Sequence, residues 1–231
     1  MIWFEKDSLD FLKELQQNNN RKWFEQNRPR YDRFIRQPML RFANEMISLM
    51  KKIDPSISVT PEEALFQPGR DTHLSYDKSP YKTHAGLLIA RKGPGSFAHP
   101  GLYVQLASSS FGVASGFHAL EPSQTMAIRR HIATNAEEFS KHLAQRRFHQ
   151  FFITIRGETN KLLPPEFRNA AEKQPLIYNK QFYYWAEHEP ERALRGDLPD
   201  FIMEHMQACT PMNEFLMRAF SPASNAVQPI V

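Results

Sequence analysis

Near residue 65 the hydrophobic pattern of this chain changes, and that change restricts the possible folds more than any other feature. Before it, apolar residues from Tyr31 to Ile53 recur at steps of three and four, which describes one face of a long helix. After it come short apolar segments typical of strands, at 64–67, 83–91, 102–106 and 111–117. Short connections rich in Gly, Pro and Ser join the last three, so the sequence predicts an antiparallel meander over about 64–118.

Helical patterns stand on both sides of the predicted meander. A short helix after Ser8 is expected to end at the Asn18–Asn20 run, and Pro38 is expected to kink or break the long helix that follows. A later strand is predicted near 181–186, because Phe, Tyr and Trp favour strands. Other segments are helices between 122 and 143, over 198–208 and over 211–220, and a stretch at 151–155 that fits a strand or a helix. The pattern predicts an α+β fold in which an antiparallel sheet packs against N- and C-terminal helices.

The composition limits the class of protein. The chain has 231 residues, 41% of them hydrophobic and 23% charged, which is typical of a globular protein that buries its own core. It contains no apolar run of 18 residues and no apolar segment at the N-terminus, so we expect no membrane association and a cytoplasmic location. The single cysteine, Cys209, excludes an internal disulfide and is expected to be an inert buried thiol. We expect one α+β domain over 1–220 and a disordered tail over 221–231.

A net charge of +4 permits a nucleic-acid partner without requiring one. The basic residues of the segment 21–41 fall opposite the apolar stripe of the long helix, where they could follow a phosphate backbone. Acidic residues interrupt this face at Glu25, Asp32 and Glu45, so a solvated surface is the favoured interpretation. Nucleic-acid binding through the Arg-rich helix remains an alternative hypothesis.

The segment 68–84 concentrates reactive side chains. Its 17 residues include three cations, two aspartates and two histidines. Pro80 sets a rigid bend, and a segment pinned at both ends can direct Arg70, Lys78 and Lys82 toward one anion. Arg suits a planar oxyanion, whereas Lys supplies a point charge. We therefore expect a site for a phosphorylated or carboxylated small molecule.

The remaining polar residues of this segment could orient the cations or transfer protons. Asp71 and Asp77 fit either role, His84 is a second candidate for proton transfer, and Tyr81 or His84 could donate a hydrogen bond to the ligand. The alternative is a charge network that only braces a long loop. Whether the protein is an enzyme stays open at this point.

Metal and cofactor motifs are not evident in the sequence. Asp71 and His73 could share one face of a strand with His84 nearby, but no His-Glu-x-x-His pair accompanies them and the neighbouring cations oppose a metal. The chain also has no nucleophile elbow, P-loop or dinucleotide fingerprint. We therefore predict no metal site, and the sequence specifies neither a cofactor nor an oligomeric state.

Several segments together resemble the domain-of-unknown-function 2461 family. They are 18–24 (Asn-Asn-Asn-Arg-Lys-Trp-Phe), 70–71 (Arg-Asp), 75–84 (Ser-Tyr-Asp-Lys-Ser-Pro-Tyr-Lys-Thr-His), 116–118, Pro122, 128–129, 163–167 and 198–201. The resemblance covers about residues 3–220, and its most specific part is Asp-Lys-Ser-Pro-Tyr-Lys-Thr. It departs from the family pattern at His73-Leu74, where an arginine and a phenylalanine are usual, and at Tyr76, which is often a lysine.

The resemblance implies a soluble, mostly bacterial protein of one domain and, as the family name says, no known activity. The residues that match the family signature are Arg70, Asp71, Asp77, Lys78, Tyr81 and Lys82. Three functional hypotheses follow from the sequence. They are binding of an anionic small molecule at residues 70–84, nucleic-acid binding by the helix at 21–41, and protein interaction with a purely structural charge network.

Overall fold

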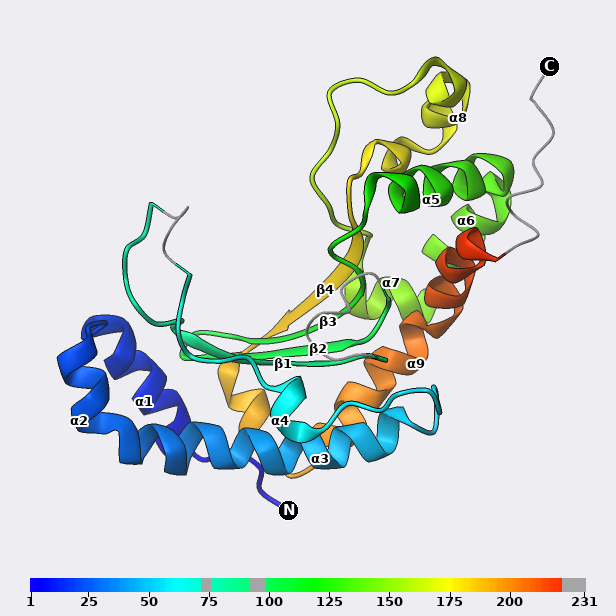
Figure 1. Ribbon diagram of the computed structural model, residues 1–231. Coiled ribbons are helices and arrows are strands. Elements are labelled where there is room, and N and C mark those ends of the chain that lie inside the picture. The colour runs from blue at the N-terminus through cyan, green and yellow to red at the C-terminus, as the bar shows by residue number, and fades with distance from the viewer. Residues whose placement is uncertain (72–75, 92–98, 222–231) are drawn as a thin grey trace. The chain divides into compact units, whose positions relative to one another are not determined.

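The computed structural model describes residues 1–71, 76–91 and 99–221 (Figure 1). The chain divides into two compact units. The first unit comprises Met1–Ser96, Gly101–Val113 and Glu187–Met203, and the second comprises Phe97–Pro100, Ala114–Ala186 and Glu204–Val231. The single domain expected over 1–220 stays a prediction. Apart from Ser221, the tail expected over 221–231 lies outside the described residues, as does the turn expected at 92–96.

A four-stranded antiparallel sheet in the order β1-β2-β3-β4 confirms the predicted α+β fold. The strands are β1 (His84–Ile89), β2 (Leu102–Ala107), β3 (Phe111–Phe117) and β4 (Phe182–His188). β1 pairs with β2 from His84 opposite Ala107 to Ile89 opposite Leu102. The predicted meander and the predicted later strand are therefore both present.

The strand predicted at 64–67 is wrong. Ala64 ends the short helix α4 (Pro61–Ala64), and only Leu65 forms a β-bridge, with Leu87. The reason is a capping box, in which the Thr60 hydroxyl accepts from the Glu63 backbone N–H while the Glu63 carboxylate accepts from the Thr60 N–H. This local signal starts a helical turn where the apolar residues alone suggested a strand.

The N-terminal helices follow the predicted pattern with an earlier start for the long helix. They are α1 (Lys6–Gln17), α2 (Arg21–Tyr31), the π-helical turn η1 (Asp32–Arg36) and α3 (Gln37–Met50). The asparagine run does separate α1 from α2, because the Asn20 side chain caps α2 by accepting from the Trp23 N–H at 3.0 Å. The second helix therefore begins directly after this run.

The long helix does not break at Pro38, because it continues as α3 directly after the π turn η1. A proline lacks an N–H and its ring crowds the carbonyl four residues earlier, which here belongs to Phe34. The turn widens so that the Gln37 N–H bonds to the Asp32 carbonyl, five residues back. The hydroxyl of Ser8, from α1, donates to the freed Phe34 carbonyl at 2.7 Å.

The core of the first unit lies where α1 and α3 pack against β2 and β1 (Figure 1). Along β2, the residues Leu102, Val104 and Leu106 are buried, whereas Tyr103 and Gln105 are half-buried. This alternation assigns the apolar residues to the helix-covered face of the sheet. The opposite face of β1 and β2 carries polar groups and contributes to the candidate site below.

The second unit adds helices to the other strands of the sheet. They are α5 (Pro122–Thr134), α6 (Ala136–Leu143), α7 (Arg146–Phe152), α8 (Arg168–Lys173) and the C-terminal part of α9 (Leu198–Met217). Short 3₁₀ turns lie at Pro165–Phe167, Pro175–Tyr178, Pro190–Leu194 and Arg218–Phe220. β3 passes close to β4 at Gly116, which has φ +100° and where a Cβ would lie 2.4 Å from the Phe182 carbonyl oxygen.

Two expectations in this region need correction or completion. The separate helices predicted over 198–208 and 211–220 form one helix, α9, which continues through Pro211 to Met217. The ambiguous stretch at 151–155 begins as the end of α7 and is not a strand, since Ile153 has a positive φ of 63°. Among the described residues, no helix has the length and apolarity needed to cross a membrane.

Candidate functional site

The segment that the sequence singled out forms two paired arms. The Phe66 N–H donates to the Gly86 carbonyl at 3.0 Å, the Lys82 N–H to Pro68 at 2.9 Å and the Arg70 N–H to Pro80 at 2.9 Å. We call residues 65–87 the signature hairpin. Its tip includes residues 72–75, so His73 of the considered metal site lies outside the described residues.

Three basic side chains lie near one another on the signature hairpin. Arg70 lies opposite Pro80 and Lys82 follows Pro80 at a step of two, so Arg70 and Lys82 project to the same side, and His84 is close enough for both charges to act on it. Burial lowers the pKa of Lys82, and the nearby Arg70 guanidinium lowers it further. Burial also lowers the pKa of His84, with Lys82 and Arg70 as additional causes. We call Arg70, Lys82 and His84 the cationic face.

The cationic face adjoins aromatic and amide groups of the open sheet surface. The Lys82 ammonium donates to the Gln67 carbonyl at 2.9 Å and lies 5.4 Å from the centre of the Phe66 ring. That ring meets Tyr103 edge-on, and the Tyr103 hydroxyl donates to Gln105 Oε1 at 3.0 Å. Burial raises the pKa of Tyr103 to about 12, so its hydroxyl keeps its proton.

Asp77 organises the tip end of the cationic face. Its carboxylate accepts from the Ser79 backbone N–H at 2.9 Å and from the Arg70 guanidinium, which also donates to the Ser79 hydroxyl at 3.2 Å. Backbone and hydroxyl hydrogen bonds from Ser79, together with Arg70, lower the pKa of Asp77 to about 2. A carboxylate that is ionised at neutral pH suits the orienting role expected for it better than proton transfer.

The other predicted site residues lie apart from the cationic face. Asp71 and Lys78 are exposed near the tip of the hairpin. Tyr81 faces the opposite side, where its ring stacks on Phe24 with centroids 3.9 Å apart. The Asn19 amide holds the Tyr81 backbone, donating to its carbonyl at 2.8 Å and accepting from its N–H at 3.1 Å. The structure therefore joins two segments of the signature that are far apart in the sequence.

Sequence reasoning missed the groups that border the cationic face on the sheet. Phe66, Tyr103 and Gln105 come from a loop and from β2, and no motif marks them. The signal that could have found Tyr103 and Gln105 is the alternation within 102–107, which places both on the face opposite the apolar core. Phe66 could be placed only through the pairing of its backbone with Gly86.

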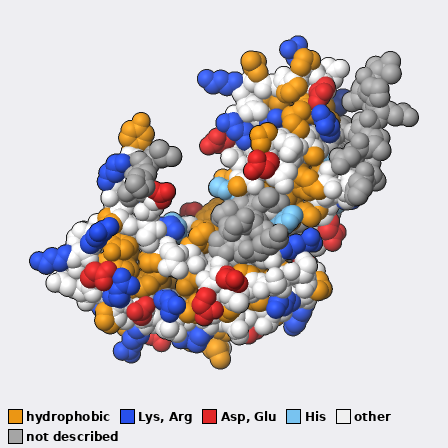
Figure 2. Space-filling view, in the orientation of Figure 1, with side chains coloured by type: hydrophobic (Ala, Val, Ile, Leu, Met, Phe, Trp, Pro, Cys, Tyr) orange, Lys and Arg blue, Asp and Glu red, His pale blue; other side chains and the backbone are white. Residues whose placement is uncertain are grey.

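Two arginines of the basic helix face are held in ion pairs. Arg28 is held by Glu25 in a two-pronged ion pair at 2.7 and 2.9 Å, and Arg30 is held by Glu14 at 2.7 and 2.8 Å. Figure 2 shows acidic and basic side chains interspersed over the visible surface of the N-terminal helices. These pairings favour the solvated-surface interpretation, and nucleic-acid binding stays a prediction. Within the part of the chain that the structure describes, no group of three or more potential metal ligands occurs.

The fold and the site define an α+β protein whose distinctive element is a charged hairpin attached to the edge of an antiparallel sheet. The chain belongs to the family described as conserved hypothetical protein (DUF2461), whose model matches residues 7–215. The match includes both segments that meet at Tyr81. No curated protein matches the chain.

Proposed function

We propose that the protein binds an anionic, phosphorylated small molecule on the cationic face of the signature hairpin. The observation that carries this proposal is the placement of Arg70, Lys82 and His84 near one another on the paired arms. Burial is the main cause of the lowered pKa of Lys82 and of His84, and repulsion from the neighbouring cations lowers both further. An anion placed between them would relieve this repulsion.

Spare hydrogen-bond donors support the proposal. The contacts that Arg70 makes with other described residues use only its Nη1 nitrogen, which leaves Nη2 and Nε available. Lys82 commits one of its three protons to the Gln67 carbonyl. The half-buried His84 ring lies beside them. A phosphate group could accept from all three side chains, and the Phe66 and Tyr103 rings would supply apolar contact for the rest of the molecule.

The same arrangement suggests which residue would transfer a proton if the ligand is also a substrate. The lowered pKa of His84 favours the neutral imidazole, which can accept a proton, whereas Asp77 is held ionised by Ser79 and Arg70. The cationic face would then stabilise a developing oxyanion. The proposal includes the bacterial setting that the family resemblance implies and the cytoplasmic location expected from the sequence.

A thermal-shift titration tests the binding proposal. The wild type would be titrated with inorganic phosphate, sugar phosphates, nucleotides, simple carboxylates and a short DNA duplex. A ligand at about 100 times its Kd adds roughly 2.7 kcal/mol, which raises the Tm of a chain this size by about 5–10 °C. The rise should disappear in Lys82→Met and persist in Lys51→Met, which removes an equivalent charge from an exposed position at the end of α3.

The pH dependence of the same titration provides a second check. Because a bound anion stabilises the imidazolium form of His84, phosphate should bind more tightly near pH 6 than near pH 8, and His84→Gln should remove most of that difference. A response to DNA alone would favour the Arg-rich helix instead. Equal responses in Lys82→Met and the wild type would refute the proposed site.

A further inference from the structure

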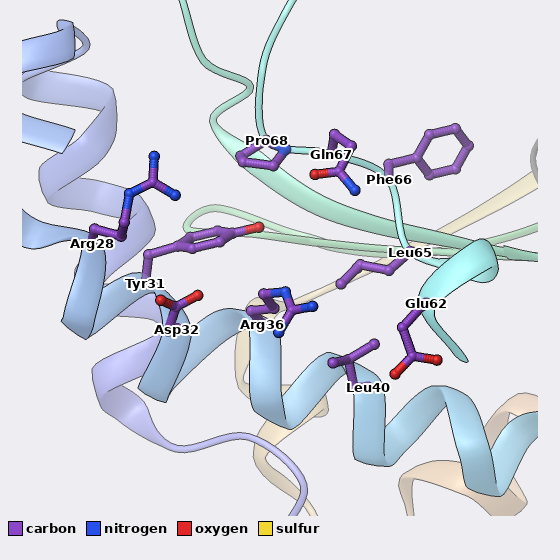
Figure 3. A pocket seen from close by; sticks show the side chains of 10 residues that line it. All are labelled: Arg28, Tyr31, Asp32, Arg36, Leu40, Glu62, Leu65, Phe66, Gln67 and Pro68. Atoms are coloured by element: carbon purple, nitrogen blue, oxygen red, sulfur yellow. The ribbon is translucent and has the colours of Figure 1, made fainter. Parts of the chain in front are cut away.

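A second candidate site lies in a pocket of the first unit (Figure 3). One wall is the helical segment from Arg28 to Leu40, and the other is the segment from Glu62 to Pro68. The pocket has a volume of about 150 Å³. A cavity of that size holds a molecule of about six non-hydrogen atoms, such as benzene.

The π turn explains why one side of the helix lines this pocket over such a length. Arg28, Asp32, Arg36 and Leu40 occur at four-residue intervals and all line the pocket. In a regular α-helix, each such interval rotates the side chain by about 40° away from the starting line. The wider turn at Asp32–Arg36 offsets part of that rotation and keeps the four residues in line. π turns are often found at functional sites for such reasons.

Four polar groups of the pocket have no hydrogen-bond or ion-pair partner among the residues that the structure describes. They are the Tyr31 hydroxyl, the Asp32 carboxylate, the Arg36 guanidinium and the Gln67 amide. Tyr31 is only 7% exposed, and Figure 3 shows its hydroxyl, together with Arg36 and Gln67, directed toward the space between the two walls. Asp32 and Arg36 are four residues apart, a spacing at which an α-helix commonly forms an ion pair. Here the two charges remain available for a ligand.

The lining carries charges of both signs, which restricts the chemistry of the ligand. The carboxylates are Asp32 and Glu62, and the arginines are Arg28 and Arg36, of which Arg28 is paired with Glu25. A ligand with only a negative charge would be repelled by the two carboxylates, and a ligand with only a positive charge would be repelled by Arg36. A molecule with one charge of each sign satisfies both sides.

We propose that this pocket binds a small free amino acid. Its carboxylate would accept from the Arg36 guanidinium and the Tyr31 hydroxyl, and its ammonium group would donate to Asp32. The side chain would lie against Leu40 and Leu65, which limits it to a few carbon atoms in the available volume. The site is distinct from the cationic face, since the main-chain oxygen of Gln67 holds Lys82 whereas the Gln67 side chain lines the pocket.

Calorimetric titration with glycine, alanine, serine and valine tests this proposal. Propionate and ethylamine serve as matched probes, because each keeps only one of the two charged groups of alanine. We expect at least one amino acid to bind, with both single-charge probes at least about tenfold weaker. Arg36→Met and Asp32→Asn should each weaken binding about 10- to 100-fold, as expected for the loss of a charged hydrogen bond.

The same helix provides matched controls. Arg33 is exposed and lies on the π turn without lining the pocket, so Arg33→Met should bind like the wild type. Lys82→Met should also bind amino acids normally, which separates this site from the cationic face. If Arg36→Met does not fold, Asp32→Asn and Tyr31→Phe decide the matter. Absence of binding by the wild type at about 10 mM, equal binding of propionate and alanine, or unchanged binding in the folded variants would overturn the proposal.

Discussion

Two groups of polar side chains, one in each unit, differ in how their hydrogen bonds are satisfied. In the second unit, the fully buried Tyr184 donates its hydroxyl to Asn213, whose amide donates to the Ser115 hydroxyl at 3.1 Å. Cys209 joins the same cluster and donates to the Met206 carbonyl at 3.3 Å. In the first unit, the cationic face and the pocket contain half-buried groups with donors to spare. We call the cluster of Ser115, Tyr184, Cys209 and Asn213 the closed network.

Arg129 shows the same contrast within one residue type. It is 4% exposed and directs its guanidinium at backbone carbonyls, at 2.8 Å to Ile177 and 2.9 Å to Asn179. Arg70, in contrast, is partly exposed and uses one nitrogen. Burial lowers the pKa of Arg129, but a guanidinium keeps its charge at any physiological pH. A buried cation whose hydrogen-bond donors all bind protein groups stabilises the fold, whereas a cation with free donors can bind a ligand.

The largest effect is expected from Arg129→Met. Methionine fills much of the same volume but leaves the carbonyls of Ile177 and Asn179 buried without donors, at about 1–3 kcal/mol each. We expect a loss of about 3 kcal/mol or more in the free energy of unfolding, measured by denaturant titration, and a Tm lower by roughly 6–12 °C. The neighbouring Arg130 is 56% exposed, so Arg130→Met is the control and should change little. Similar losses in both variants would break the contrast between buried and exposed arginines.

The next largest effect is expected from Tyr184→Phe. The substitution keeps the ring, which packs against Phe148 and Phe152, and removes only the hydroxyl that donates to Asn213. The oxygen of the half-buried Asn213 then loses this donor, at a cost of about 1–2 kcal/mol in the free energy of unfolding. Tyr183→Phe, on the half-buried side of the same strand, serves as the control. A loss below that of the control would show that water reaches the network.

The same contrast explains which features the sequence could predict. Periodicity sufficed for α1 and the long helix, because each buries one face over several residues, and apolar or aromatic composition sufficed for the strands β1 to β4. It failed at 64–67, where the Thr60–Glu63 capping box overrides a short apolar run. It also did not join 198–208 with 211–220, which are continuous in α9 as far as Met217.

For the candidate sites, the sequence could predict which segments are rich in charged residues but not how those residues are arranged. The density of basic residues in 68–84 drew attention to Arg70 and Lys82, but their common face depends on the pairing of residues 66–70 with 80–86. Pro38 predicted a disturbed helix, whereas the π turn also needs Ser8, a residue 26 positions away, to satisfy the Phe34 carbonyl. The stacking of Tyr81 on Phe24 likewise joins distant segments. Such long-range contacts leave no periodic trace in a single sequence.

A smaller, stabilising effect is expected at Ile153, where the second unit tolerates backbone strain next to its closed network. This β-branched residue has φ 63° and ψ −56° and is 67% exposed, while its neighbours Phe152 and Ile155 are buried. Ile153→Gly should raise the free energy of unfolding by about 0.5–1 kcal/mol, because glycine adopts positive φ without steric cost. Thr154→Gly, at a residue without positive φ, should instead destabilise. Destabilisation by both substitutions would show that the turn is not strained.

The smallest effect is expected from Asp77→Asn, because the Asp77 carboxylate is exposed and its pairing with Arg70 is screened by water. The pKa of Asp77 is lowered to about 2 from an ordinary value of 3.8, so its contribution to stability is present above about pH 4 and is lost as the pH falls toward 2. Carbon-13 NMR of the carboxyl group should show this titration directly. Stability at pH 7 should decrease less in Asp77→Asn than in Tyr184→Phe, and the difference from the wild type should vanish near pH 2. If Asp77→Asn were the more destabilising of the two, the hairpin charges would belong to the framework of the fold, and the argument for a ligand on the cationic face would lose its main support.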